Sequence, residues 1–87
     1  MNFHPKSKMN ATTVQREYIR NARKAVKIAN DVKFNAVAYG HQAGWAEAYW
    51  VNYLKSVGAK NFRDRVERLH ALLAAKDTQG ALKYLSL

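Results

Sequence analysis

The apolar residues in the first half of the chain recur every three or four positions, which is the spacing of one face of an α-helix. No stretch alternates apolar and polar residues for long, and β-branched residues are sparse, so strands are not expected. The sequence therefore predicts an all-α fold, a small helical bundle of three to five helices. The stripe that carries this prediction consists of Val14, Tyr18, Ala22, Ala25, Ala29, Val32 and Ala36.

Residues 1–11 precede this stripe and lack its helical spacing. They contain the single proline of the chain, Pro5, and two lysines. We interpret them as a flexible basic N-terminal arm, with Thr12 or Thr13 as the N-cap of the first helix. The remaining residues, 12–87, are expected to form a single helical domain, because 87 residues is a usual length for one domain.

The course of the chain between residues 30 and 45 allows alternative interpretations. The apolar stripe stays in phase long enough for one helix over residues 13–39, but Asn30-Asp31 could interrupt it, with Asp31 capping a second helix. We favour the break. Gly40 and Gly44 either bracket a turn at His41-Gln42 or lie on a continuous helix, where small residues let another helix approach closely.

The segment from Ala43 to Val57 has a regular helical period, and Gly58 is a typical C-cap residue. Its apolar face consists of Ala46, Tyr49, Trp50, Tyr53, Leu54 and Val57.

Two further helices are predicted near the C-terminus, over residues 62–75 and from Asp77-Thr78 to about Tyr84. Asn61 and Asp64 have the spacing of a capping box at the start of the first of them. Because the connection is short, we expect a C-terminal αα-hairpin. The side chains expected to be buried are Phe62, Val66, Leu69, Leu73, Ala81, Leu82 and Leu85.

The chain carries 15 Lys and Arg residues against 6 Asp and Glu residues, a net charge of +9. A magnitude of roughly 2–8 suffices for the solubility of a small domain. Such an excess of positive charge favours binding to polyanions, namely nucleic acid, nucleoprotein or an acidic protein surface.

Much of this charge lies on one side of the first helix, opposite the apolar stripe, with Glu17 to its side. Neighbouring like charges repel each other at these spacings, and a partner's phosphates or carboxylates would relieve the repulsion. We predict that this basic face binds the anionic partner. It consists of Arg16, Arg20, Arg23, Lys24 and Lys27.

The helix over residues 62–75 also contains three arginines, but acidic residues accompany them. Arg63 with Glu67, and Asp64 with Arg68, have the spacing of intrahelical ion pairs. On this basis only Arg65 is expected to be free to contact a partner.

Four aromatic residues lie close together at positions 45–53: Trp45, Tyr49, Trp50 and Tyr53. Aromatic clusters of this kind usually form the core of a small bundle. Trp45 and Tyr49 lie towards the edge of the apolar face, so we expect them, together with Arg65, to be available as an interface.

The chain lacks cysteine, so disulfides are excluded. The histidines His4, His41 and His70 have none of the short spacings typical of a metal site, and we expect neither a metal nor another cofactor. No nucleophile and base can be paired from the residues present, so we do not expect an enzyme.

No apolar run approaches the ~18 residues of a membrane-spanning helix, and no secretory signal is visible. We therefore expect a cytoplasmic protein that does not bind membranes. A chain this short has a modest core, so stabilisation as a homo-oligomer is an option.

Several scattered residues resemble part of the phage anti-CBASS proteins, which sequester cyclic oligonucleotides. They are Phe3-His4-Pro5, Ile19-Arg20 and Glu47-Ala48 with Trp50 and Asn52. In that family the Glu-Ala pair lies one residue further from the tryptophan, and this chain continues well beyond the comparable region. The resemblance therefore assigns no site residue here.

Two functions follow as hypotheses. The first is a non-enzymatic binding protein that docks its basic face on nucleic acid or nucleoprotein, through phosphate contacts that need not specify sequence. The second is a small inhibitor or adaptor, of the kind that viruses and mobile elements encode, that binds an acidic surface of a host protein.

Overall fold

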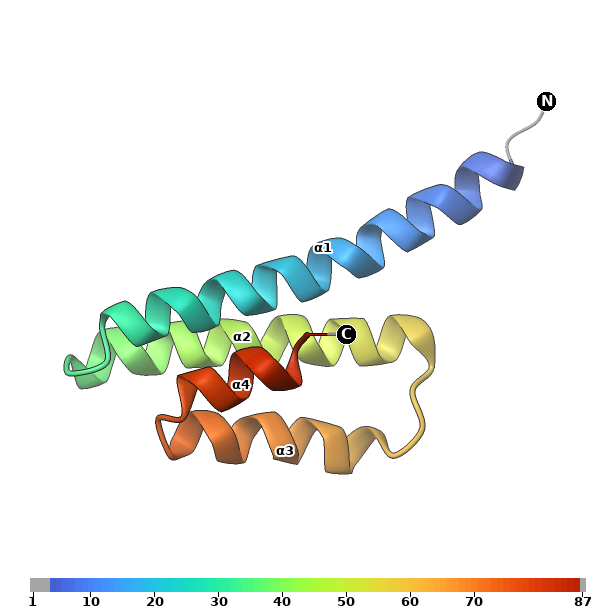
Figure 1. Cartoon of the computed structure of the whole chain (residues 1–87). Helices are drawn as coiled ribbons and strands as arrows, with labels where there is room; N and C mark the ends of the chain where they lie inside the picture. Colours follow the sequence, from blue (N-terminus) through green and yellow to red (C-terminus); the bar gives the residue numbers. More distant parts are fainter. Residues whose placement is uncertain (1–3, 87) are drawn as a thin grey trace.

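The computed structural model describes residues 4–86 of the chain, with side chains from residue 13 onward. These residues form four helices and no strand (Figure 1). The prediction of a small all-α bundle is thus confirmed. In chain order the helices are α1 (His4–Asp31), α2 (Ala36–Val57), α3 (Phe62–Ala74) and α4 (Thr78–Tyr84).

The four helices pack as two hairpins. α1 and α2 run antiparallel on either side of a tight turn, and α3 and α4 form the predicted C-terminal hairpin (Figure 1). α4 contacts α1 as well as α3, and α3 contacts α2, which closes the bundle. The N-terminal turns of α1 extend beyond the other helices (Figure 1).

Helix α1 begins at His4, so the predicted N-cap at Thr12 or Thr13 is wrong, because both threonines lie inside the helix. Proline is tolerated in the first turn of a helix, where its missing N–H would have no partner, so Pro5 does not prevent the early start. The boundary that we placed between residues 11 and 12 is therefore not a helix boundary, and residues 1–3 of the predicted arm lie outside the described residues.

The predicted break after residue 30 is confirmed, and the alternative of one helix over residues 13–39 is wrong. The N-cap of α2 is Asn35 rather than Asp31, since the Asn35 side chain accepts a hydrogen bond from the Ala38 amide at 3.0 Å. Gly40 and Gly44 both lie inside α2, so the chain makes no turn between them.

Of the other predicted capping residues, Gly58 and Asp77 cap their helices, whereas the side chain of Asn61 does not. Gly58 ends α2 in the left-handed conformation (φ 60°), and the Asp77 carboxylate accepts from the Gly80 amide at 2.9 Å at the start of α4. Asn61 precedes α3 at φ 57° and its side chain makes no cap hydrogen bond, so the capping box with Asp64 is wrong. The left-handed backbone is not the extended conformation that a capping side chain requires.

The core lies where α1, α2 and the C-terminal hairpin meet. The largest side chains with less than 2% exposure are Trp50, Leu54, Leu69, Leu73, Leu85, Val26 and Thr78. The alanines of the predicted stripe, Ala22, Ala25 and Ala29, are buried, but Val14 is 46% exposed. Val26 lies outside the predicted stripe but is fully buried in the same core, so the buried face of α1, which contacts both α2 and α4, is wider than predicted.

Two residues expected in the core, Val57 and Phe62, are instead about 40% exposed. Both lie at helix ends beside the connection between α2 and α3, where fewer neighbours cover them.

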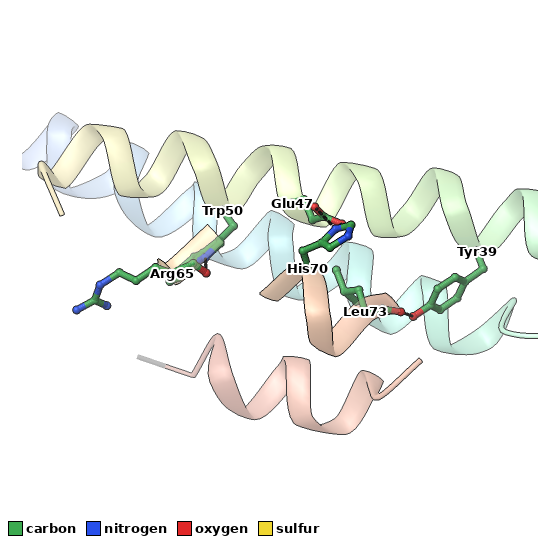
Figure 2. A network of polar contacts seen from close by, with 6 residues as sticks. All are labelled: Tyr39, Glu47, Trp50, Arg65, His70 and Leu73. Atoms are coloured by element: carbon green, nitrogen blue, oxygen red, sulfur yellow. Dashed lines mark hydrogen bonds and ion pairs between the residues drawn. The ribbon is translucent and has the colours of Figure 1, made fainter. Parts of the chain in front are cut away.

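Polar contacts join α2 to the C-terminal half of the chain (Figure 2). The Trp50 indole donates to the Arg65 carbonyl at 2.9 Å, and the Tyr39 hydroxyl donates to the Leu73 carbonyl. These bonds fix the position of α3 along α2, which apolar packing alone specifies less strictly.

Candidate anion-binding face

The basic face lies on the solvent side of α1, as its helical spacing predicts. Arg16, Arg20, Lys24 and Lys27 are exposed, and Arg23 is half-buried beside the C-terminal residues. Four of the five predicted cations line a shallow open hollow of about 430 Å³, namely Arg20, Arg23, Lys24 and Lys27. Arg16 lies one helical turn before this hollow. The structure therefore gathers most of the predicted anion-binding residues around one surface depression.

One cation of the basic face has an acidic partner. The Arg20 guanidinium contacts the Glu17 carboxylate at 2.8 Å, where we had expected Glu17 to lie to the side of the face. The side chains are 70% and 46% exposed, so the pair contributes roughly 0–1 kcal/mol and opens easily. Arg20 is therefore available to a stronger anionic ligand.

Arg23 is held by a contact that the sequence alone did not reveal. Its guanidinium donates to the Ser86 hydroxyl at 2.7 Å, and that hydroxyl donates to the Leu82 carbonyl at 2.9 Å. The 63 positions between Arg23 and Ser86 explain why no local pattern predicted the contact. Because Ser86 is neutral and no described carboxylate pairs with Arg23, this lining residue of the hollow keeps its positive charge.

The expected ion pairs within α3 are wrong. Within the described part of the chain, no carboxylate lies within ion-pair distance of Arg63 or Arg68, since the ion pairs there are Arg20–Glu17 and His70–Glu47. Exposed side chains at this spacing are free to adopt other rotamers, which explains the failure.

The basic face of α1 and the arginines of α3 therefore differ in the number of acidic residues that accompany them, and not in the ion pairs that we predicted within α3. Two acids accompany the three arginines of α3, whereas Glu17 is the single acid among residues 16–27 of α1.

Arg65 is exposed and has no ion pair with a described carboxylate, but part of its guanidinium is engaged with the backbone. Its guanidinium Nε donates to the Lys60 carbonyl at 2.9 Å, and its own carbonyl accepts from Trp50 (Figure 2). It lines a separate hollow with Asn61, Asp64, Arg68 and Tyr84. The predicted interface of Trp45, Tyr49 and Arg65 is thus not gathered at one hollow.

The aromatic cluster divides between core and surface. Trp50 is buried and Tyr53 half-buried, whereas Trp45 is 55% exposed and stacks on Tyr49 with ring centroids 6.0 Å apart. Trp45 and Tyr49 line a groove of about 270 Å³ between α1 and α2, which Lys24 also lines. Lys24 thereby connects the basic hollow with the aromatic groove, a juxtaposition that the sequence did not indicate.

The ionisable groups outside the basic face offer little chemistry. His70 contacts Glu47 at 3.0 Å across α2 and α3 (Figure 2), a pair 23 positions apart that no local pattern indicates. Burial raises the pKa of the Tyr39 hydroxyl, which is already engaged with Leu73. Within the described residues no three His, Cys, Asp or Glu side chains are grouped to hold a metal.

Over the same residues, no helix combines the length and the apolar character needed to cross a membrane.

Comparisons with protein-family models, with curated proteins and with solved structures found no match to this chain.

Proposed function

We propose that the protein is a non-enzymatic binding module that docks the basic face of α1 on nucleic acid. The supporting observation is the hollow lined by Arg20, Arg23, Lys24 and Lys27, which holds four positive charges and no carboxylate among its described lining. Phosphates spaced along a nucleic acid backbone would neutralise these charges together. Such contacts position a protein without reading bases, so we propose no sequence specificity.

Salt dependence tests the proposal directly. Each neutralised phosphate releases counterions and contributes about −0.9 to the slope of log K against log salt. Four phosphates give a slope of about −3.6, so affinity for a short labelled DNA duplex should fall roughly 150-fold between about 50 and 200 mM salt. Fluorescence anisotropy measures this slope, and a flat response would refute the proposal.

Charge reversal with a matched control separates the basic face from net charge. Replacing Arg20, Arg23 and Lys27 by Glu lowers the net charge from +9 to +3, because each reversal changes it by two. Replacing Lys55, Lys60 and Arg63 by Glu has the same effect on net charge, but these residues lie outside α1 and its hollow. The first variant should lose duplex binding and the control should keep most of it. Equal losses would show that the face itself does not bind.

Glu17→Gln provides a test in the opposite direction. It removes the carboxylate that contacts Arg20 at 2.8 Å, so Arg20 becomes free for a phosphate. We expect tighter binding at every salt concentration with a similar slope, because Arg20 is already one of the four cations counted above and no longer has to leave a carboxylate. Weaker binding would mean that Glu17 helps to form the site.

A second candidate function is that of an adaptor for an acidic protein surface. Phe34 is 98% exposed and Val37 is 71% exposed at the turn between α1 and α2, outside the basic hollow. Phosphate binding does not require exposed apolar side chains, whereas protein interfaces use them. Affinity purification with and without nuclease distinguishes the two functions, since recovery of one stoichiometric protein after nuclease treatment supports the adaptor.

A further inference from the structure

We propose that the groove between α1 and α2 binds an unpaired nucleobase, so that the preferred partner is single-stranded rather than duplex nucleic acid. This inference rests on the proposed function and specifies its ligand. Base and phosphate would occupy two adjoining sites, the aromatic groove and the basic hollow, with Lys24 between them.

The groove has the composition of a base-binding site. α1 contributes Asn21, Lys24, Ala25 and Ile28, and α2 contributes Gln42, Trp45 and Tyr49. The α2 side is mainly aromatic, and the α1 side combines two aliphatic with two polar side chains. An unpaired base stacked on the α2 side would thus meet both aliphatic and polar side chains of α1.

Trp45 supplies the stacking surface. It is 55% exposed although it packs on Tyr49 with an interplanar angle of 27°. The Tyr49 contact restricts the orientation of the indole, so less entropy is lost when a ligand stacks on its open part. Base stacking on aromatic side chains tolerates any sequence, because every base has a π-face.

Two neutral amides lie beside this surface. Asn21 and Gln42 line the groove, and neither side chain forms a hydrogen bond with the described part of the chain. Each amide offers both donors and an acceptor, which suits the mixed edge of a nucleobase. Unpaired carboxylates, which would repel a nucleotide, are absent from the described lining of the groove.

Single strands fit this arrangement better than duplexes. A base within a duplex is stacked on its neighbours and must be unstacked before a side chain can cover it. A single strand presents its bases at little cost while its phosphates follow the cations. Lys24 faces both sites, so a strand along α1 could place one phosphate in the hollow and the attached base in the groove.

The test compares three variants on three probes of equal length. The variants are Trp45→Ala, Trp45→Phe and Phe34→Ala, the last removing an aromatic residue that is 98% exposed and lies outside the groove. The probes are a thymidine oligonucleotide, its abasic counterpart and a duplex, all measured by anisotropy over the same series of salt concentrations. Circular dichroism establishes that each variant is folded.

We expect Trp45→Ala to weaken binding of the thymidine strand about 10-fold, which corresponds to about 1.4 kcal/mol. Its affinity for the abasic strand and the duplex should not change, because these probes present no accessible base. Trp45→Phe should bind nearly as well as the original chain, and Phe34→Ala should be unaffected. Quenching of Trp45 emission by the thymidine strand, and not by the abasic strand, is the independent signature of stacking.

The failure of this inference is distinguishable from the failure of the proposed function. If the original chain binds all three probes with a steep salt dependence and Trp45→Ala reduces them equally or not at all, base binding is refuted and phosphate docking stands. If no probe binds with a steep salt dependence, both are refuted.

Discussion

Replacing Gly40 and Gly44 by alanine should stabilise this bundle. Both glycines lie inside α2 and are exposed, and apart from the adjacent helix backbone a Cβ added at either position would meet no described atom within 4 Å. Glycine in a helix interior costs about 0.8–1.0 kcal/mol relative to alanine. The two positions lie one helical turn apart, and because a methyl group at either has open space, the double variant should gain roughly 1–2 kcal/mol.

Thermal unfolding followed by circular dichroism at low protein concentration measures this gain. For a domain of 60–100 residues, 1 kcal/mol shifts Tm by about 4–8 °C, so the double variant should unfold roughly 5–15 °C higher. Gly58→Ala is the matched control, since Gly58 has φ +60°. The left-handed conformation costs an L-residue about 1–2 kcal/mol, so this variant should unfold at a lower temperature.

An unchanged or lower Tm for the double variant would refute the reasoning that Gly40 and Gly44 face open space. If the Tm of the double variant falls further below that of the original chain as the protein concentration rises, self-association is the cause. A second copy that binds the folded state acts as a ligand and makes Tm depend on protein concentration. In that case a second copy of the chain packs on Gly40 and Gly44, as the option of a homo-oligomer predicts.

Three further predictions concern the polar contacts, each measured by urea denaturation. Burial raises the pKa of Tyr39, so the folded state favours the protonated hydroxyl. The resulting stabilisation of the fold is complete below the ordinary pKa of 10.0 and is lost as the pH rises through the raised pKa. Stability should therefore fall at alkaline pH, and Tyr39→Phe should reduce this fall while losing the bond to Leu73. Trp50→Phe removes the indole donor to the Arg65 carbonyl, which still accepts from the Tyr84 hydroxyl at 3.4 Å, and the lost bond should cost about 0.5–1.5 kcal/mol. Asp77→Ala removes the α4 cap and should cost about 1 kcal/mol, whereas Asp77→Asn should cost less.

The fold was predictable where one local rule determined the outcome. Helical periodicity gave the all-α class, and Gly58 and Asp77 marked helix ends because their backbone or side-chain chemistry acts within a few residues. The start of α1 was not predictable from Thr12 and Thr13, since a capping residue signals a helix start only where the chain before it leaves the helix. The burial of Val26 was not predictable from the stripe either, because α1 packs against α2 and against α4, which is distant in sequence.

The basic face was predictable because exposure follows from the same period that defines the buried stripe. The ion pairs and hydrogen bonds of its side chains were not predictable in this way. Spacing permits ion pairs in both α1 and α3, yet one forms at Arg20 and none forms at Arg63 or Arg68 among the described residues. Exposed ion pairs of this kind contribute so little that side-chain entropy decides between paired and unpaired rotamers. Sequence spacing therefore identifies where positive charge lies, but not which charges are neutralised.

The aromatic groove depends on the position of the turn between α1 and α2. Lys24 and Trp45 are 21 positions apart. On one continuous helix they would lie roughly 31 Å apart, since each residue adds 1.5 Å. The break after Asp31, with Asn35 as the new N-cap, instead folds α2 back so that Trp45 and Lys24 line one groove. Because the sequence left both interpretations of residues 30–35 open, the basic face could be predicted from it and the groove beside that face could not.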